Sequence, residues 1–466
     1  MSKGKDLLKN TLIYTIGSIG SKVLSFALLP IYSFYLTKDK LGVYDLILTT
    51  ISLVVPIITL QLSQANYRWL LDAKNDNDTK KAVSTAFFSV TLLISLFVLF
   101  YIFLSRYFAI PYEKYFILLL ITTSYFNFFQ DYSRGIKKNK LYAATGIVYS
   151  LGLLFFTIIF LILLKWEIEG ILLASIISYA ISIVIVLINT KVAKDISWRF
   201  VSKEKLKLML HYSGPLIPNT ISWWLINASN RYIILWGMDI EANGLFAVAA
   251  RFPGILNIIN SIFMLAWQDH TIQNSQLDGS FSGKIFELYY KMELSVTIIL
   301  IACSKYIVKY FFSETFFESW KFMGILFLAS AFSAFGAYYG AVYLREKKTI
   351  GLFSTTILGG LINIIFSFLL IKQIGLFAPA VGSLLGFTVV FIARKHQTKL
   401  YFNISYNQRL FTILCFIAFG WLFLSLIGVV LVDIAIIFIS ILLALYLNKE
   451  FIQRIFQYIT PLSLRK

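Results

Sequence analysis

The chain has 466 residues, of which 58% are hydrophobic and only 14% are charged. Soluble globular domains carry about 25% charged residues, so this composition excludes an ordinary soluble protein. Lysine and arginine number 42 against 23 acidic residues, a net charge of +19. Most of these cations lie in the connections between apolar segments, which is typical of cytoplasmic loops beside an anionic leaflet and not of a nucleic-acid surface. We therefore expect a membrane protein with no nucleic-acid partner.

Apolar segments recur along the whole chain at the length that a membrane span requires. A hydrocarbon core about 30 Å thick needs about 20 residues of helix. The segments lack the period-two alternation of a transmembrane barrel, which predicts an all-α integral membrane fold. The last two are joined almost directly, so twelve or thirteen spans also fit the pattern. To within a few residues, the fourteen predicted spans are 11–36, 42–70, 82–105, 114–134, 141–164, 169–190, 212–236, 243–268, 286–304, 321–344, 349–371, 376–393, 410–427 and 428–447.

The basic residues also predict an orientation. Lys3, Lys5 and Lys9 precede the first span, and no small-residue cleavage site follows, so we interpret it as an uncleaved span. The excess of lysine and arginine in alternate connections places both the N- and C-termini in the cytoplasm. Two scattered cysteines and three scattered histidines predict neither a disulfide framework nor a metal site, and no cofactor is expected.

The longest basic connection divides the spans into two groups of six. We predict an N-terminal lobe at 1–190, a basic cytoplasmic linker at 191–211 and a C-terminal lobe at 212–399, followed by an extra span pair and basic tail at 400–466. The start of span two resembles the start of span eight at a constant offset of 202 positions, as in Gly42 with Gly244 and Tyr44 with Phe246. Internal repeats of this kind are common in secondary transporters, which favours two pseudo-symmetric lobes.

Polar residues follow one face of each of four spans. Packing between helices explains serine and threonine at these positions, but the charged residues point to a wet cavity. The first pair of spans in each lobe would then line that cavity. Spans one, two, seven and eight carry, respectively, Ser18, Lys22 and Ser25; Asp45, Thr49 and Ser52; Asn227, Asn230 and the adjacent Arg231; and Arg251.

Two of these cations lie deep in their spans. At 1.5 Å per helical residue, Lys22 lies about 16 Å and Arg251 about 12 Å from the nearer span end. A basic side chain near mid-bilayer costs at least about 2.5 kcal/mol, so it normally faces water or a partner. Arg68 and Arg231 lie near span ends, where long side chains reach the interface. Asp45 is the one acid on these faces, and either a salt bridge to Arg231 or a role in ion coupling fits it.

Several motifs resemble the polysaccharide-transport flippases of the multidrug/oligosaccharidyl-lipid/polysaccharide (MOP) exporter superfamily. Leu41-Gly42-Val43-Tyr44, with the later Arg68, resembles the second-span signature of that family. That family often has Asp where Asn230 stands and Tyr where Phe246 stands. Further similarity, to its spans seven and eight, lies in Pro215-Leu216-Ile217-Pro218, Asn230-Arg231, Asn243-Gly244-Leu245-Phe246 and Ala266-Trp267.

The resemblance implies alternating access by two lobes around a V-shaped central cavity. Its basic lining residues would be Lys22, Arg68, Arg231 and Arg251, and the extra span pair can form a groove for a lipid tail. A cationic cavity selects anions. We therefore expect a flippase of the bacterial cytoplasmic membrane that moves a lipid-pyrophosphate-linked oligosaccharide to the outer leaflet for cell-surface polysaccharide synthesis. It would act as a monomer among membrane lipids, with H⁺ or Na⁺ as the coupling ion.

Two other function classes remain open. An ion-coupled exporter of drugs or small cations would need buried carboxylates, and the candidates within spans, Asp45, Glu293 and Asp433, do not align on one pair of facing helices. A membrane-embedded enzyme of lipid-linked glycan assembly would usually carry a large extracytoplasmic loop, and no predicted outer connection is long enough. No nucleotide-binding G-x-x-x-x-G-K-[ST] loop is present.

Overall fold

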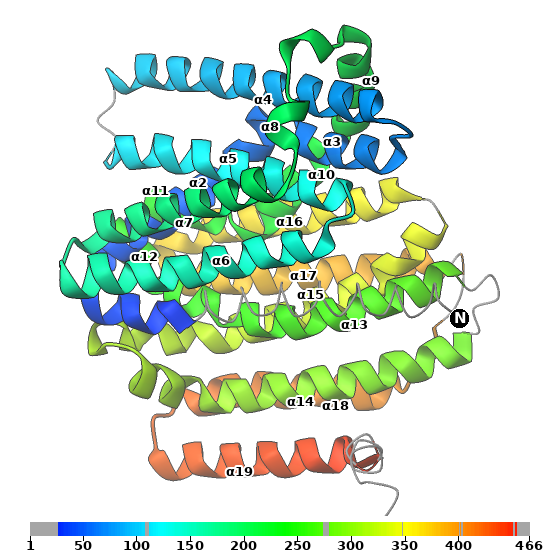
Figure 1. Cartoon of the computed structure of the whole chain (residues 1–466). Helices are drawn as coiled ribbons and strands as arrows, with labels where there is room; N and C mark the ends of the chain where they lie inside the picture. The colour runs from blue at the N-terminus through cyan, green and yellow to red at the C-terminus, as the bar shows by residue number, and fades with distance from the viewer. Residues whose placement is uncertain are drawn as a thin grey trace, which may run out of the picture. The chain divides into compact units, whose positions relative to one another are not determined.

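The computed structural model describes residues 27–107, 111–273, 279–346, 348–399, 401, 404–450 and 453. Within these ranges the chain is built from helices, without a β-strand, and the predicted all-α fold is confirmed (Figure 1). The chain forms two compact units, Met1–Trp224 and Leu225–Lys466. The division falls inside helix α10 (Leu216–Asn227). The predicted lobe boundaries around 191–211 therefore stay a prediction.

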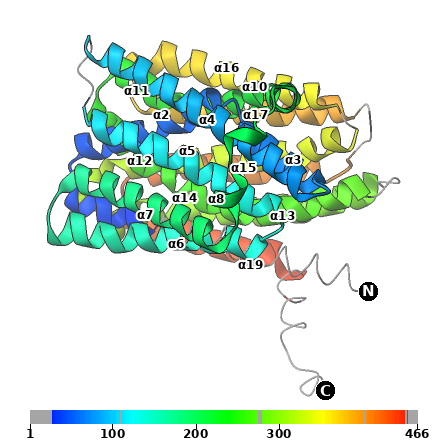
Figure 2. The ribbon, with the colours of Figure 1, turned by 45° about the horizontal axis from the view of Figure 1, so that its top comes forward.

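The first unit consists of helices joined by short turns. Helices α6 and α7 pack side by side (Figure 2), and α5 packs against both α7 and α3. Side chains cap two of the helix starts: Asn75 accepts a hydrogen bond from the Asp78 amide and Ser202 from the Lys205 amide. After a helical segment at 27–35, the elements are α2 Lys38–Ile58, α3 Leu62–Asp72, α4 Asp76–Ser105, α5 Glu113–Gly135, α6 Asn139–Thr157, the π-helix η1 Ile158–Leu163, α7 Glu167–Asn189, α8 Val192–Asp195, the 3₁₀-helix η2 Trp198–Phe200, α9 Lys203–Ser213 and the first part of α10.

The second unit is organised around one almost wholly buried helix. This is α15 (Trp320–Arg345), against which α13, α14 and α17 pack (Figure 1). The remaining elements are α11 Asn230–Gly237, α12 Ile240–Arg251, α13 Pro253–Gln273, α14 Gly279–Phe311, the 3₁₀-helix η3 Glu314–Ser319, α16 Thr349–Ile374, α17 Phe377–Thr398, α18 Gln408–Ser425 and α19 Val430–Leu447.

Ten helices in the described ranges are long and apolar enough to cross a membrane. The chain is therefore a multi-pass membrane protein, as predicted, while the total of fourteen spans stays a prediction. Most of the predicted span 11–36 lies outside the described residues. Helix α5 has 23 residues but is too polar to count among the ten. The predicted spans 212–236 and 243–268 each appear as two shorter helices.

Three of the predicted spans are interrupted in this way. The segment 42–70 divides into α2 and α3, where Leu60 and Gln61 adopt left-handed φ angles of 48° and 54°. Residues 212–236 divide into α10 and α11 between Asn227 and Asn230, and 243–268 divides into α12 and α13 at Phe252. Pro253, which has no amide hydrogen to donate, begins α13 as prolines often do at the first helical position. All three interruptions fall in spans that the sequence assigns to the cavity.

A buried arginine joins three helices of the second unit. The Arg394 side chain of α17 is 2% exposed. Its Nε donates to the Thr355 hydroxyl (3.0 Å), its Nη1 to the Gly336 carbonyl (3.0 Å), and its Nη2 to the Thr356 hydroxyl (2.8 Å) and the Leu352 carbonyl (3.3 Å). These bonds connect α17 with α15 and α16. Neutral acceptors alone therefore satisfy this buried cation.

Replacing Arg394 with methionine removes these four hydrogen bonds while keeping an unbranched apolar side chain. We expect Arg394→Met to lower the free energy of unfolding by about 2–4 kcal/mol, because the hydrogen bonds to a buried charged group are lost and a cavity forms. Thermal unfolding of the purified protein in detergent measures this. The exposed Arg409, at the start of α18, supplies the control substitution Arg409→Met. Equal transition temperatures for the two variants would show that Arg394 does not stabilise the packing of α15, α16 and α17.

Candidate functional site

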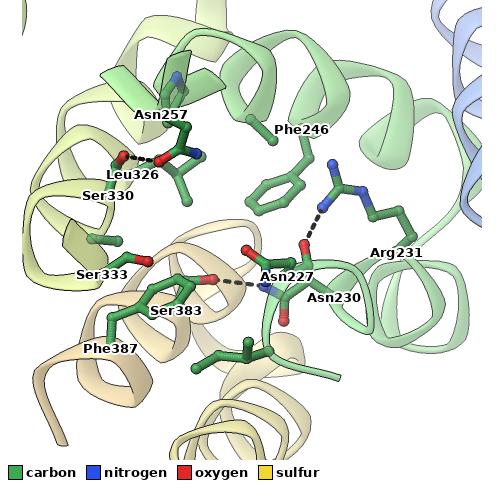
Figure 3. Close-up of a pocket in the computed structure, with 14 residues that line it drawn as sticks. Asn227, Asn230, Arg231, Phe246, Asn257, Leu326, Ser330, Ser333, Ser383 and Phe387 are labelled. Carbon is green, nitrogen blue, oxygen red and sulfur yellow. Dashed lines mark hydrogen bonds between the residues drawn. The ribbon is translucent and has the colours of Figure 1, made fainter. Parts of the chain in front are cut away.

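A pocket of about 100 Å³ lies in the second unit, where two interrupted helices meet α15 and α17 (Figure 3). The end of α10 and the start of α11 form one wall, and the end of α12 and the start of α13 form another. Discontinuous membrane helices commonly form transporter binding sites, because their ends free backbone groups and leave room for a ligand. The polar lining residues are Asn227, Asn230, Arg231, Asn257, Ser330, Ser333 and Ser383; the apolar ones are Ile226, Phe246, Ala250, Pro253, Leu326, Ala329 and Phe387.

Asn230, the first residue of α11, is held firmly by its neighbours. It is 1% exposed, and its Nδ2 donates to the Ser383 hydroxyl (2.8 Å) and to the Pro379 carbonyl (3.1 Å), both on α17. Ser367 of α16 donates to its Oδ1 at 3.4 Å. The side-chain amide of Asn230 thus ties α11 to α16 and α17 at the inner edge of the pocket.

The break between α10 and α11 frees carbonyls that would otherwise accept helical hydrogen bonds. Asn363 of α16 donates to the Ile226 carbonyl (3.2 Å). Figure 3 shows the second bond, in which Arg231 Nη1 donates to the Asn227 carbonyl (3.1 Å). Side-chain donors therefore cap both carbonyls. Each of these two oxygens already accepts a hydrogen bond, which makes it a weaker ligand for a cation.

Arg231 is the charged residue among the described residues that line the pocket. Its guanidinium carbon lies 5.6 Å from the centroid of the Phe246 ring, within range of a cation–π interaction. The side chain is half-buried. No carboxylate is found among these lining residues. A guanidinium is therefore the one ionised group that the described lining residues bring to the pocket.

Of the seven polar lining residues, Asn227, Asn230 and Arg231 were predicted from the sequence and the other four were not. Asn257 accepts a hydrogen bond from Ser330 at 3.0 Å. It lies on α13, beyond the helix break that separates it from Arg251 at the end of α12. It lies three residues beyond Gly254 and four before Ser261. This helical spacing was a usable signal. Ser330, Ser333 and Ser383 had none, since single hydroxyls occur throughout membrane helices.

Other predicted site residues lie outside this pocket. Arg251 ends α12 with an exposed side chain, next to the lining residue Ala250. Arg68, near the end of α3, is 46% exposed and forms an ion pair with Asp72 at 2.5 Å. Ser18, Lys22 and Ser25 lie outside the described residues.

The predicted face of α2 belongs to the first unit. Asp45 is buried there, and the Thr49 carbonyl accepts hydrogen bonds from Trp224 Nε1 (3.1 Å) and from the Ser52 hydroxyl (2.7 Å). The predicted pairing of Asp45 with Arg231 would join the two units and stays a prediction. Among the described residues, no group of three or more His, Cys, Asp or Glu could hold a metal ion.

Residues 7–268 match the family described as "Polysaccharide biosynthesis protein". This match covers more than half of the chain. The chain belongs to that family. A search of curated protein sequences found no match.

Solved structures agree on the fold. The lipid II flippase MurJ, in an inward closed conformation, matches 96% of this chain with all of its own, at a TM-score of 0.70 and 16% identity. An inward-facing multidrug resistance MATE family transporter matches 82% of this chain with 94% of its own, at a TM-score of 0.67 and 14% identity. A MOP superfamily transporter from Pyrococcus furiosus is described as having a binding pocket of reverse polarity. It matches 84% of this chain with 94% of its own, at a TM-score of 0.57 and 16% identity. The fold is therefore that of the MOP superfamily, as predicted.

Substitution of Asn230 tests whether it holds the pocket wall together. Asn230→Leu removes the two hydrogen bonds donated to α17 and leaves buried acceptors behind. We expect a loss of about 1–3 kcal/mol in the free energy of unfolding. Ser333→Ala is the matched control, because no hydrogen bond of the Ser333 hydroxyl is found in the described ranges; its effect should stay within about 0.5 kcal/mol. Thermal unfolding in detergent compares the two, and an equal effect would argue against this role for Asn230.

Proposed function

We propose that this protein is a flippase that moves a lipid-pyrophosphate-linked oligosaccharide from the inner to the outer leaflet of a bacterial cytoplasmic membrane. The observation that carries the proposal is the polarity of the pocket in the second unit. Its described lining has one arginine, three asparagines and three serines, with no acid. Arginine suits phosphate geometry, and amides and hydroxyls suit sugar hydroxyl groups.

The capped carbonyls support an anionic substrate over a cationic one. A cation would be bound by carboxylates or free carbonyl oxygens. The Ile226 and Asn227 carbonyls at the helix break already accept hydrogen bonds from Asn363 and Arg231. The described lining residues that could contact a ligand are Arg231 and neutral amides and hydroxyls. This set fits a phosphate with an attached sugar.

The size of the pocket limits what it takes up. A water molecule needs about 10–15 Å³ of this kind of space, so about 100 Å³ accommodates a phosphate with an attached sugar but not a whole oligosaccharide. We propose that the pocket binds one end of the head group and that Lys22, Arg68 and Arg251 contact the rest. Ser18, Ser25, Asp45, Thr49, Ser52, Asn227 and Asn230 would line the path between the lobes.

The interrupted helices suggest how the lobes move. Breaks after α2, α10 and α12 allow short helices to tilt with little loss of hydrogen bonding, as in hinge motions. We propose alternating access by a monomer with both termini in the cytoplasm, driven by an ion gradient of H⁺ or Na⁺. The lipid tail would remain in the bilayer, with the extra span pair as its groove. No chemical step on the substrate is needed, so the protein would not be an enzyme.

A cation or drug exporter is the second candidate, because MATE family transporters share the fold. It is favoured by the buried carboxylates of Asp45 and Glu293. Purified protein in liposomes separates the two functions. A fluorescent lipid-pyrophosphate-linked oligosaccharide should become accessible to a membrane-impermeant quencher on the opposite leaflet, whereas a lipophilic cation should not be concentrated. Movement of the cation without movement of the glycolipid would exclude the flippase.

Arg231 provides the variant that tests the pocket. In this liposome assay at limiting substrate, Arg231→Ala should reduce the rate of glycolipid movement by about 10–100-fold, since a hydrogen bond to a charged group contributes about 1.5–3 kcal/mol. Arg231→Lys keeps the positive charge but lacks the planar guanidinium group, so its transport rate should lie between those of the wild-type protein and Arg231→Ala. The exposed Arg409→Ala should transport at the wild-type rate. An unchanged rate for well-folded Arg231→Ala would contradict the role of the pocket.

A further inference from the structure

A second polar cluster lies next to the pocket and contains an acid. Glu293 sits in the middle of α14, inside the predicted span 286–304, and is 2% exposed. Asn260 of α13 donates from Nδ2 to Glu293 Oε1 at 2.9 Å. The hydroxyl of Tyr289, one turn earlier on α14, donates to Asn260 Oδ1, also at 2.9 Å. The three side chains form a short buried chain of hydrogen bonds.

Aromatic rings surround this chain. Phe263 of α13 stacks on Tyr289 with ring centroids 4.1 Å apart, and Tyr338 of α15 lies 6.0 Å from the same ring. The titratable group that accompanies Glu293 in this cluster is the phenol of Tyr289, on its own helix. The Tyr338 hydroxyl points elsewhere, because it donates to the Ser282 carbonyl at 2.8 Å. Among its described side chains, helix α13 contributes the neutral amide of Asn260.

No cation balances Glu293 among the described residues. The lysines of α14 that form ion pairs do so elsewhere: Lys291 pairs with Glu287 at 2.7 Å, and Lys305 pairs with Asp433 of α19 at 2.8 Å. Helices α18 and α19 also pack on α14. The buried acid that they bring, Asp433, is neutralised by Lys305. Glu293 thus differs from Asp433, the other deeply buried acid of this unit.

An ionised carboxylate without a countercharge is costly in the interior of a membrane protein. The site therefore requires either a proton or a bound cation. A hard cation needs several free oxygen ligands. In this cluster, Asn260 presents its N–H to Glu293, and the oxygen of Asn260 is already occupied by Tyr289. The arrangement suits a proton on the carboxyl group better than a metal ion.

Helix α13 connects this cluster to the pocket. Asn257, which lines the pocket, lies three residues before Asn260, so the two side chains share one helical face. Helix α13 begins at Pro253, immediately after the break at Phe252. A ligand that displaces the start of α13 would also displace Asn260 from Glu293. The carboxyl group would then lose its hydrogen-bond donor.

We propose that Glu293 is the proton-binding site that couples transport to a proton gradient, with α13 as the link to the pocket. The carboxylate takes up one proton from water when the cluster is open, holds it while the cluster is closed, and returns it to water on the other side. No covalent bond of the substrate changes. This inference rests on the proposed transport function and names the proton as its coupling ion.

Infrared difference spectroscopy on the purified full-length protein tests proton binding without any substrate. A pH change should produce a band from a protonated carboxyl group that Glu293→Gln abolishes. Glu287→Gln, on the same helix and paired with Lys291, should leave that band in place. Tyr289→Phe should shift the band, because it alters the hydrogen bond that orients Asn260. A band retained in Glu293→Gln, or one that responds to sodium at constant pH, would overturn the proposal.

Transport in liposomes tests the coupling. A pH gradient should accelerate movement of the fluorescent glycolipid by the wild-type protein, whereas the rate of Glu293→Gln should be the same with and without the gradient. Glu287→Gln should retain both. Acceleration that persists in Glu293→Gln would refute the coupling. If the wild-type protein moves no glycolipid at all, the proposed function fails, whereas the infrared result still decides whether Glu293 binds a proton.

Discussion

A bilayer offers no hydrogen-bond partner to a buried polar group, so the protein must supply one for each. In the second unit this requirement explains contacts that are otherwise unrelated. Four neutral acceptors surround Arg394, Lys305 pairs with Asp433, and Asn363 caps a carbonyl at the α10 break. Among the buried ionisable side chains of the second unit named here, Glu293 stands apart, because one amide and no cation accompany it in the described part of the chain. A polar group that is incompletely compensated in a membrane usually serves a function.

In the second unit the continuous helices form a closely packed framework, whereas the interrupted helices line the pocket. Helices α15, α16 and α17 run unbroken, and α16 and α17 approach so closely that a Cβ on Gly359 would lie 2.7 Å from the Gly386 carbonyl oxygen. Small residues at such contacts allow dense packing without a hydrophobic driving force. Helices α11, α12 and α13, which adjoin the breaks, lie against this framework and carry much of the pocket lining. A rigid framework beside interrupted helices lets the pocket change shape while the bundle persists.

Hydropathy alone was enough to predict the all-α membrane fold and most span positions, because the length of a membrane helix follows from bilayer thickness. The helix breaks were harder to predict. Pro253 marks one of them, but Leu60 and Gln61 are ordinary residues whose left-handed conformation depends on tertiary packing. Asn227, Asn230 and Arg231, which the sequence placed on one span, all line the pocket. The sequence could not reveal that the Asn230 amide is bound by Ser383, since contacts between distant helices leave no local pattern.

The separation of the acid from the pocket has an electrostatic reason. Two like charges 4 Å apart repel by about 4 kcal/mol at an effective dielectric constant of 20, so a carboxylate on the pocket wall would oppose a pyrophosphate there. Glu293 instead interacts with Asn260, one turn of α13 beyond the lining residue Asn257. At that position a change in its charge reaches the pocket through movement of a helix and not through direct repulsion. Arg231 can then attract the head group, while the proton controls when α13 moves.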